Sequence, residues 1–116
     1  MTAKKENRPK IGDRIRVIID RPVGSHHLEY PDLIYPINYG YVEGIFAEDG
    51  EEQDVYVLGE TEKIEYFEGI IIAVIHRFDD SEEKWVAAKE GTHYTKEEIE
   101  ERTRFQERFF HSEIRM

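Results

Sequence analysis

The sequence contains no cysteine, four prolines and no long hydrophobic run. Without cysteine the chain has no disulfide framework, no thiolate metal site and no thiol nucleophile. The longest apolar run covers only residues 70–75, whereas a membrane-spanning helix needs about 20 residues. Residues 1–10 are polar and lack the apolar centre of a secretion signal. We therefore expect a cytoplasmic protein that does not enter a membrane and whose residues 1–10 are flexible.

Positive charge is scarce as well. The chain has 16 Lys and Arg against 26 Asp and Glu, which gives a formal net charge of −10. An excess of negative charge repels phosphate backbones and anionic lipids, so we expect no nucleic-acid partner and no membrane surface as a partner. A bound metal ion reverses the local field, however, and allows an acidic protein to bind an anion.

Several catalytic signatures are also missing. The sequence has no glycine-rich dinucleotide fingerprint, no phosphate-binding P-loop and no serine-hydrolase elbow. The five histidines do not follow the spacing of a zinc site. These absences remove support for the common nucleotide-binding folds, for serine hydrolases and for zinc enzymes.

What is present indicates one mainly β domain over residues 1–116, a length typical of a single domain. Alternating apolar residues and turn signals predict five short strands. They cover residues 14–20, 41–46, 54–58, 69–78 and 84–88. The second and third strands form one expected hairpin, and the fourth and fifth form another. The continuous apolar stretch of the fourth strand predicts that both of its faces are covered.

One helix is predicted near the C-terminal end. Thr95 and Glu98 have the spacing of a capping box, which marks a helix N-terminus. Ile99, Phe105 and the pair Phe109–Phe110 supply an imperfect apolar side. Five antiparallel strands followed by a helix predict a small barrel, although the strand pattern alone does not distinguish a barrel from a sandwich.

Acidic residues are concentrated in two predicted turns. The first turn and its flanks carry Asp49, Glu51, Glu52 and Asp54; the second carries Asp79, Asp80, Glu82 and Glu83. If both turns lie at one end of the barrel, so many carboxylates require a divalent cation, and Mg²⁺ prefers such oxygen ligands. The alternative is that both turns are ordinary solvated loops.

Four sequence segments resemble the soluble family I inorganic pyrophosphatases. The first two are Tyr35-Pro36-Ile37-Asn38-Tyr39-Gly40 and Asp49-Gly50-Glu51-Glu52-Gln53-Asp54. The others are Glu82-x-Lys84-x-Val86-Ala87 and Asp20-x-Pro22-x-Gly24-Ser25. The resemblance runs from about residue 11 to the end of the helix. It implies a five-stranded OB-like antiparallel barrel with a C-terminal helix, and a possible homo-oligomer.

The resemblance also implies an activity, which is Mg²⁺-dependent hydrolysis of pyrophosphate or a similar small phosphate, with Mn²⁺ as a possible substitute. The implied metal ligands are Asp49, Asp54, Asp79 or Asp80, Glu82 and, at the rim, Asp20. The implied catalytic residues are Glu51 as the base, Asp54, Tyr39 and Lys84. Tyr39 and Lys84 would bind phosphate oxygens.

The chain departs from the family at its cationic positions. The family's lysine after Gly-Ser and its arginine before Tyr-Pro have no counterpart in the short segment 26–34, and Phe109–Phe110 replace a Tyr-Lys pair. Each lost charge-assisted contact weakens binding by about 1.5–3 kcal/mol. The candidates to replace these cations are Arg21, Arg77, His26 and His27. Two alternatives therefore stay open: an impaired relative that binds a divalent metal and a phosphorylated ligand, and a non-enzymatic OB-like binding module.

Overall fold

The computed structural model describes residues 8–116. Most of the segment expected to be flexible, residues 1–7, lies outside this range. From residue 8 onward the chain is tied to the barrel. The Arg8 guanidinium donates to the carbonyl of Phe46, donates to Gln53 Oε1 at 3.2 Å, and lies 5.4 Å from the centre of the Trp85 ring.

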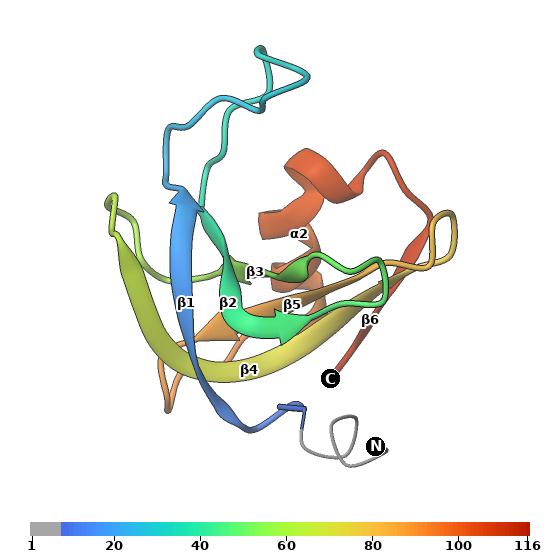
Figure 1. The fold of residues 1–116 in the computed structure, drawn as a ribbon. Helices are drawn as coiled ribbons and strands as arrows, with labels where there is room; N and C mark the ends of the chain where they lie inside the picture. The colour runs from blue at the N-terminus through green and yellow to red at the C-terminus, as the bar shows by residue number, and fades with distance from the viewer. Residues whose placement is uncertain (1–7) are drawn as a thin grey trace.

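The five predicted strands and the helix are all present, with ends shifted by up to three residues (Figure 1). The elements are β1 (Arg14–Arg21), β2 (Asn38–Phe46), β3 (Glu52–Val57), β4 (Tyr66–Arg77), β5 (Glu83–Ala88), α2 (Lys96–Glu107) and β6 (Ser112–Arg115). The short strand β6 pairs with the end of β4 and was not predicted. Within residues 8–116, no helix is long and apolar enough to cross a membrane.

Five strands close into a barrel, as predicted. The order β1-β2-β3-β5-β4 returns to its start because β4 also pairs with β1. The pairings within this ring are antiparallel except one, since β3 and β5 run parallel. The expectation of antiparallel pairing throughout is therefore wrong at this position. Hairpin signals report only neighbouring strands, whereas the β3–β5 pair joins strands separated by all of β4.

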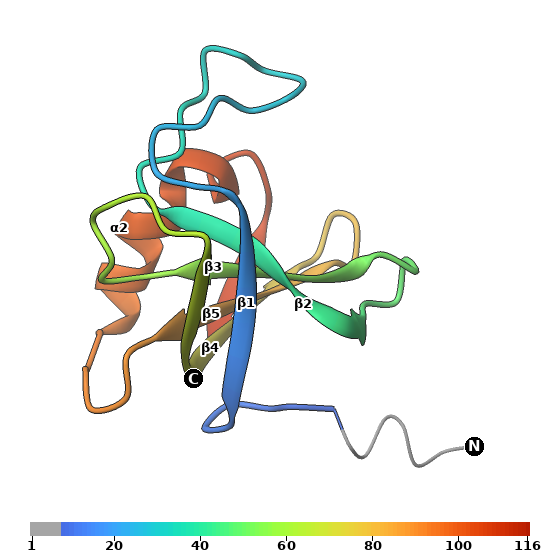
Figure 2. The ribbon, with the colours of Figure 1, turned by 60° about the vertical axis from the view of Figure 1, so that its left-hand side comes forward.

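The apolar side chains form two clusters, one inside the barrel and one between the barrel and α2. Val17, Val55 and Trp85 belong to the interior cluster. Tyr56 and Ile99 belong to the second, which lies under the helix that covers one side of the barrel (Figure 2). The strand β4 alternates between buried and half-buried residues, so its second face is less covered than the sequence predicted.

Helix α2 begins with the predicted capping box. The Glu98 amide donates to Thr95 Oγ1 at 3.1 Å, and the Thr95 amide donates to Glu98 Oε1 at 2.8 Å. The helix ends at Glu107, so Phe109 and Phe110 belong to the following turn rather than to the apolar side of the helix. Apolar spacing alone did not reveal this end, because no glycine or proline marks it.

The fold explains why two positions at the start of β2 hold asparagine and glycine. A Cβ atom at Gly40 would lie 1.8 Å from the carbonyl oxygen of Ile18, so only glycine permits the β1–β2 approach. The buried Asn38 side chain accepts from the Val23 amide at 3.0 Å and donates to the carbonyls of Glu60 and Glu62. These contacts fix the backbone on both sides of Tyr39, whose side chain lines a pocket.

Candidate active site

Lys84 lies at the centre of a charged cluster at one end of the barrel. Its side chain is 7% exposed, and its Nζ atom donates to Asp54 Oδ2 at 2.6 Å and lies 3.0 Å from Glu82 Oε1. The parallel register of β3 and β5 sets Val55 opposite Trp85, which brings the preceding residues, Asp54 and Lys84, together.

The environment of Lys84 keeps its ammonium group charged. Burial opposes the charged form, but the charge of the Asp54 carboxylate and its hydrogen bond favour it, and the pKa of Lys84 is raised above its ordinary value. Burial also disfavours the charged form of Tyr39, which here is the phenolate, and so raises the pKa of Tyr39 above the usual range of a phenol. Its hydroxyl therefore stays protonated at neutral pH. The two residues therefore present a cation and a neutral hydroxyl group to the pocket.

Arg77 is the second cation of the cluster and is more deeply held. Its side chain is 5% exposed, and its guanidinium donates to both carboxylate oxygens of Glu107, at 3.0 and 2.7 Å. Its Nη1 atom also lies 3.4 Å from Asp80 Oδ2 and 3.7 Å from Glu82 Oε1. The ring of Phe110 covers the guanidinium at 3.7 Å. Arg77 thus links the end of α2 to the second acidic turn.

A chain of buried hydrogen bonds continues from Glu107 toward the pocket. The Tyr56 hydroxyl donates to Glu107 Oε2 at 2.5 Å and accepts from Gln106 Nε2 at 2.7 Å. The Tyr35 hydroxyl donates to Gln106 Oε1 at 3.1 Å. Burial, with the Glu107 carboxylate as the next cause, raises the pKa of Tyr56 well above its ordinary value. This network joins β3, α2 and the segment before β2 through groups that satisfy one another.

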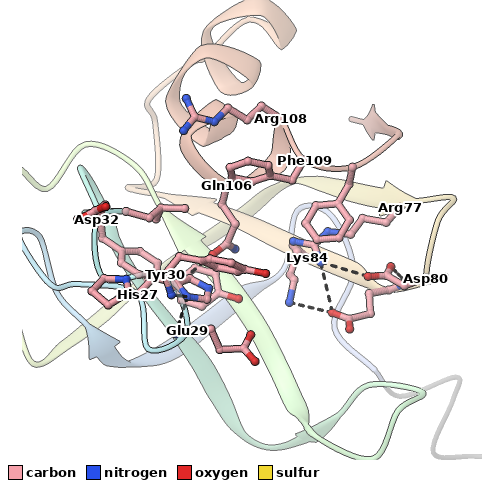
Figure 3. Close-up of a pocket in the computed structure, with 16 residues that line it drawn as sticks. His27, Glu29, Tyr30, Asp32, Arg77, Asp80, Lys84, Gln106, Arg108 and Phe109 are labelled. Carbon is pink, nitrogen blue, oxygen red and sulfur yellow. Dashed lines mark hydrogen bonds and ion pairs between the residues drawn. The ribbon is translucent and has the colours of Figure 1, made fainter.

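The cluster borders a pocket of about 900 Å³ (Figure 3). Three predicted site residues with direct roles in the cluster, Arg77, Asp80 and Lys84, occupy one end. The segment that carries His27 and Tyr30 forms the opposite end, and Gln106, at the end of α2, lies between them. Glu82 and Tyr39 also line this pocket.

Asp20 stands at the end of β1 beside this cluster. Burial raises its pKa, Arg21 opposes the rise, and the nearby Asp54 carboxylate adds to it. Both Asp20 and Asp54 remain partly exposed, at 47% and 36% of their side chains. Solvent and ligands can therefore reach both carboxylates, although neither residue lines the pocket.

Three predicted site residues lie apart from this group, and a fourth, Arg21, lies at its edge, where its Nη1 atom is 3.8 Å from Asp20 Oδ2. Asp49 and Glu51 are exposed at the tip of the β2–β3 hairpin, where Asp49 Oδ1 accepts from the Glu51 amide at 2.9 Å. Asp79 accepts from the His111 amide at 3.0 Å, so Asp80, not Asp79, is the residue of that pair at the pocket. Arg21 donates to the carbonyl of its neighbour Asp20 at 3.0 Å and does not line the pocket.

The residues fit a metal ion only in part. Among residues 8–116, no three His, Asp or Glu side chains are arranged to hold one metal ion together. Mg²⁺, however, often uses only one or two carboxylates and takes its other ligands from water and substrate phosphates. The pair Asp20 and Asp54 fits that second case. The donor set therefore suits an Mg²⁺ ion that arrives with a phosphate, rather than a cage built of protein ligands alone.

Sequence reasoning missed the residues beneath and opposite the cluster. Glu107 and Gln106 are buried polar residues of α2, on the same helix face as Ile99 and Thr103. Positions 99, 103, 106 and 107 have helical spacing, and the last two are strongly polar. Polar residues on an otherwise buried helix face were the only sign in the sequence that this face meets buried polar partners. The segment that carries His27 and Tyr30 was interpreted as a surface loop, and nothing in its pattern indicates a pocket wall.

The comparisons with known proteins agree on one family. The family model described as inorganic pyrophosphatase matches residues 7–114. The inorganic pyrophosphatase of Saccharolobus solfataricus is 34% identical over 65 residues, a match that spans 43% of this chain and 38% of that relative.

Solved structures show the same fold. The inorganic pyrophosphatase from Ehrlichia chaffeensis superposes with a TM-score of 0.67 at 18% identity, over 92% of this chain and 89% of that one. The enzyme from Thermus thermophilus gives 0.60 at 16% identity, over 92% and 85% of the two chains. The family match covers nearly the whole barrel and helix described above, and on that ground the chain belongs to the inorganic pyrophosphatase family.

Proposed function

We propose that this chain hydrolyses inorganic pyrophosphate, or a similar small phosphoanhydride, with Mg²⁺ as its cofactor and Mn²⁺ as a possible substitute. The observation that carries the proposal is the contact of the buried Lys84 ammonium with Asp54 and Glu82, beside a pocket that Lys84 and Glu82 line. Family membership supports the same reaction. The cluster combines a fixed cation for phosphate oxygens with accessible carboxylates for a divalent cation.

In this proposal Asp20 and Asp54 hold Mg²⁺ that is also bound to the substrate. When bound, the metal neutralises phosphate oxygens and lowers the pKa of a water molecule. Lys84 binds a phosphate oxygen as a point charge, and the Tyr39 hydroxyl donates to another. The oxygen of water forms a bond to one phosphorus and the bridging P–O bond breaks. The leaving oxygen takes a proton, so that pyrophosphate and one water become two hydrogen phosphates.

The geometry favours a different proton acceptor from the Glu51 that the resemblance implies. A general base must lie within hydrogen-bond reach of the water that it activates. Glu82 lies 3.0 Å from Lys84 Nζ and lines the pocket, whereas Glu51 is exposed at the hairpin tip. We therefore propose Glu82 for this role in place of Glu51.

The test is phosphate release from pyrophosphate with Mg²⁺, comparing the parent protein with Asp54→Asn. The substitution keeps the shape of the side chain and removes the charge that would hold the metal. We expect the activity to fall by more than the roughly 10–100-fold that loss of an outer-shell partner of a metal costs.

The matched control is Glu68→Gln, which also removes one negative charge, from a side chain that is 58% exposed and faces Arg16 at 3.9 Å. It should retain full activity. If the parent releases no phosphate with Mg²⁺ or Mn²⁺ at high enzyme concentration, the proposal is wrong. Equal activity of Asp54→Asn and Glu68→Gln would remove Asp54 from the site.

A further inference from the structure

The pocket beside Lys84 is larger and more aromatic than a bare diphosphate needs. Its volume of about 900 Å³ lies at the upper end of the range of about 300–1,000 Å³ that is typical of drug-sized ligands. Away from the charged end, aromatic side chains line it. His27, Tyr30 and Tyr35 come from the segment before β2, and Phe109 comes from the turn after α2.

Two of these aromatic side chains are exposed in spite of their size. Tyr30 is 65% exposed and Phe109 is 60% exposed. The next residue, Phe110, is occupied with the Arg77 guanidinium, whereas the Arg108 guanidinium lies 4.9 Å from the centre of the Phe109 ring and leaves this side chain more than half exposed. Tyr30 and Phe109 therefore offer ring surface that a ligand can cover, from two different segments that border one pocket.

The wall that carries Tyr30 is already organised. The ring nitrogen Nδ1 of His27 accepts from the amides of Glu29 and Tyr30, at 3.1 and 3.3 Å, which fixes the imidazole ring. That ring lies 5.3 Å from the Tyr30 ring and stacks on the Tyr35 ring at 6.2 Å with an interplanar angle of 3°. A planar group that binds beside Tyr30 therefore contacts side chains that are already ordered in the free protein, so binding loses little conformational entropy there.

The charge of the pocket argues in the same direction. Among the described residues, its lining includes three cations, Arg77, Lys84 and Arg108, against four acids, Glu29, Asp32, Asp80 and Glu82. Arg77 is already paired with Glu107. A ligand that carries only negative charge gains little binding free energy from such a lining. A ligand that adds a neutral aromatic group to its phosphates gains more, because aromatic side chains stack on any base.

Building on the proposed hydrolysis, we propose that the preferred substrates are nucleoside diphosphates. The phosphates lie at Lys84, and the base packs on Tyr30 and Phe109. The bonds change as they do for pyrophosphate. The oxygen of water bonds to the β-phosphorus and the bond from this phosphorus to the bridging oxygen breaks. The nucleoside monophosphate, one phosphate and one proton are released.

The first measurement is binding without turnover, by calorimetry in the presence of Mg²⁺. The probes are the methylene-bridged analogue of adenosine diphosphate and methylenediphosphonate, which share the same non-hydrolysable diphosphate. The proposal predicts that the nucleoside analogue binds at least about tenfold more tightly, a factor in the range that stacking on one aromatic side chain supplies. Equal affinity, or no binding of the nucleoside analogue, overturns it.

Variants identify the surface responsible. Tyr30→Ala and Phe109→Ala should each weaken binding of the nucleoside analogue by about tenfold and leave methylenediphosphonate unchanged. Tyr30→Phe, which keeps the ring, should bind as the parent does. Leu28→Ala is the control, because Leu28 is 76% exposed on the same segment and does not line the pocket. If both alanine variants behave like Leu28→Ala, the proposed stacking surface is wrong.

Turnover separates this inference from the proposed function. Phosphate release is measured from pyrophosphate and from adenosine diphosphate, and a higher kcat/KM for the nucleotide supports the inference. Hydrolysis of pyrophosphate alone overturns the inference and leaves the proposed function intact. If neither compound is hydrolysed, the proposed function fails, and the preference for the nucleoside analogue over methylenediphosphonate still decides whether the aromatic wall recognises a base.

Discussion

Lys84 and Arg77 are the two buried cations of the site, but they are held in different ways. Lys84 is shared between Asp54 and Glu82, both about one-third exposed, so a phosphate oxygen can replace one of these partners. Arg77 is paired with Glu107, which is only 7% exposed, and is capped by Phe110. We infer that Lys84 contacts the substrate while Arg77 fixes the end of α2.

The proposed proton acceptor gives a comparison between two glutamates. We expect Glu82→Gln to lower kcat for pyrophosphate by about 10²–10⁴-fold, the usual contribution of a general base. Glu51→Gln should change kcat less than threefold, roughly the effect of an exposed charge outside the site. Steady-state kinetics of both variants decide the point. A larger loss in Glu51→Gln would mean that the hairpin tip supplies the base.

Asp20 gives a stability prediction with a defined pH dependence. Burial and then Asp54 raise the pKa of Asp20. An acid with a raised pKa in the folded state stabilises the fold fully below its ordinary pKa of about 3.9, and this contribution is lost as pH rises through the folded-state pKa. Asp20→Asn should therefore be more stable than the parent at pH 7, by a small amount because the side chain is half exposed.

The measurement is urea unfolding of both proteins at pH 7 and near pH 3.5. The difference in free energy of unfolding should be present at pH 7 and shrink at the lower pH. A variant that is less stable than the parent at pH 7 contradicts this account. Phosphate release by the same variant should fall, because Asp20 is a proposed metal ligand.

Tyr39, Asp54, Glu82 and Lys84 were predicted as site residues from the segments that resemble the family, and the structure brings these four together. Their roles stay predictions. Glu107 was not predicted, because its role depends on a contact with Arg77 thirty residues away. No local pattern records a partner at that distance.

At the scale of the elements, the position of α2 depends on a buried charge. Glu107 accepts from Arg77 of β4 and from Tyr56 of β3, and Ile99 packs in the cluster below the helix. Removing one partner of a buried ion pair is costly because the other charge is left unpaired. The docking of the helix on the barrel therefore depends on Glu107.

Glu107→Gln should lower the free energy of unfolding by about 3–5 kcal/mol. Glu101→Gln, at an exposed position of the same helix, should change it by less than about 0.5 kcal/mol. Urea unfolding, followed by tryptophan fluorescence and by circular dichroism, measures both. Equal stability of the two variants would show that the Arg77–Glu107 pair does not hold the helix.

The five strands of the barrel could be predicted, and how they close could be predicted only in part. The hairpins β2–β3 and β4–β5 follow from turns that the sequence displays. The parallel β3–β5 pair and the strand β6 depend on contacts between distant segments. The contact between Asp54 and Lys84 in the site could not be predicted from strand patterns for the same reason, because the β3–β5 register brings these two residues together.

For the whole molecule, the net charge of −10 predicts how stability responds to salt. Self-repulsion destabilises a compact acidic protein. At 0.01 M salt the Debye length is about 30 Å, which is comparable to the dimensions of the molecule, 42 × 32 × 26 Å. At 0.1 M salt it falls to about 10 Å. Tm at neutral pH should therefore rise by a few degrees between 0.01 and 0.3 M NaCl. A constant or falling Tm would show that self-repulsion is unimportant.

We propose that this acidic barrel catalyses phosphoanhydride hydrolysis through the cluster around Lys84. A single-turnover measurement tests this, with protein in excess over Mg²⁺-pyrophosphate and phosphate followed in time. We expect the parent protein to release two phosphates per pyrophosphate and to require Mg²⁺. We also expect the rate to fall sharply in Asp54→Asn. No release by the folded parent protein with Mg²⁺ or Mn²⁺, or release that Asp54→Asn leaves unchanged, would contradict this proposal.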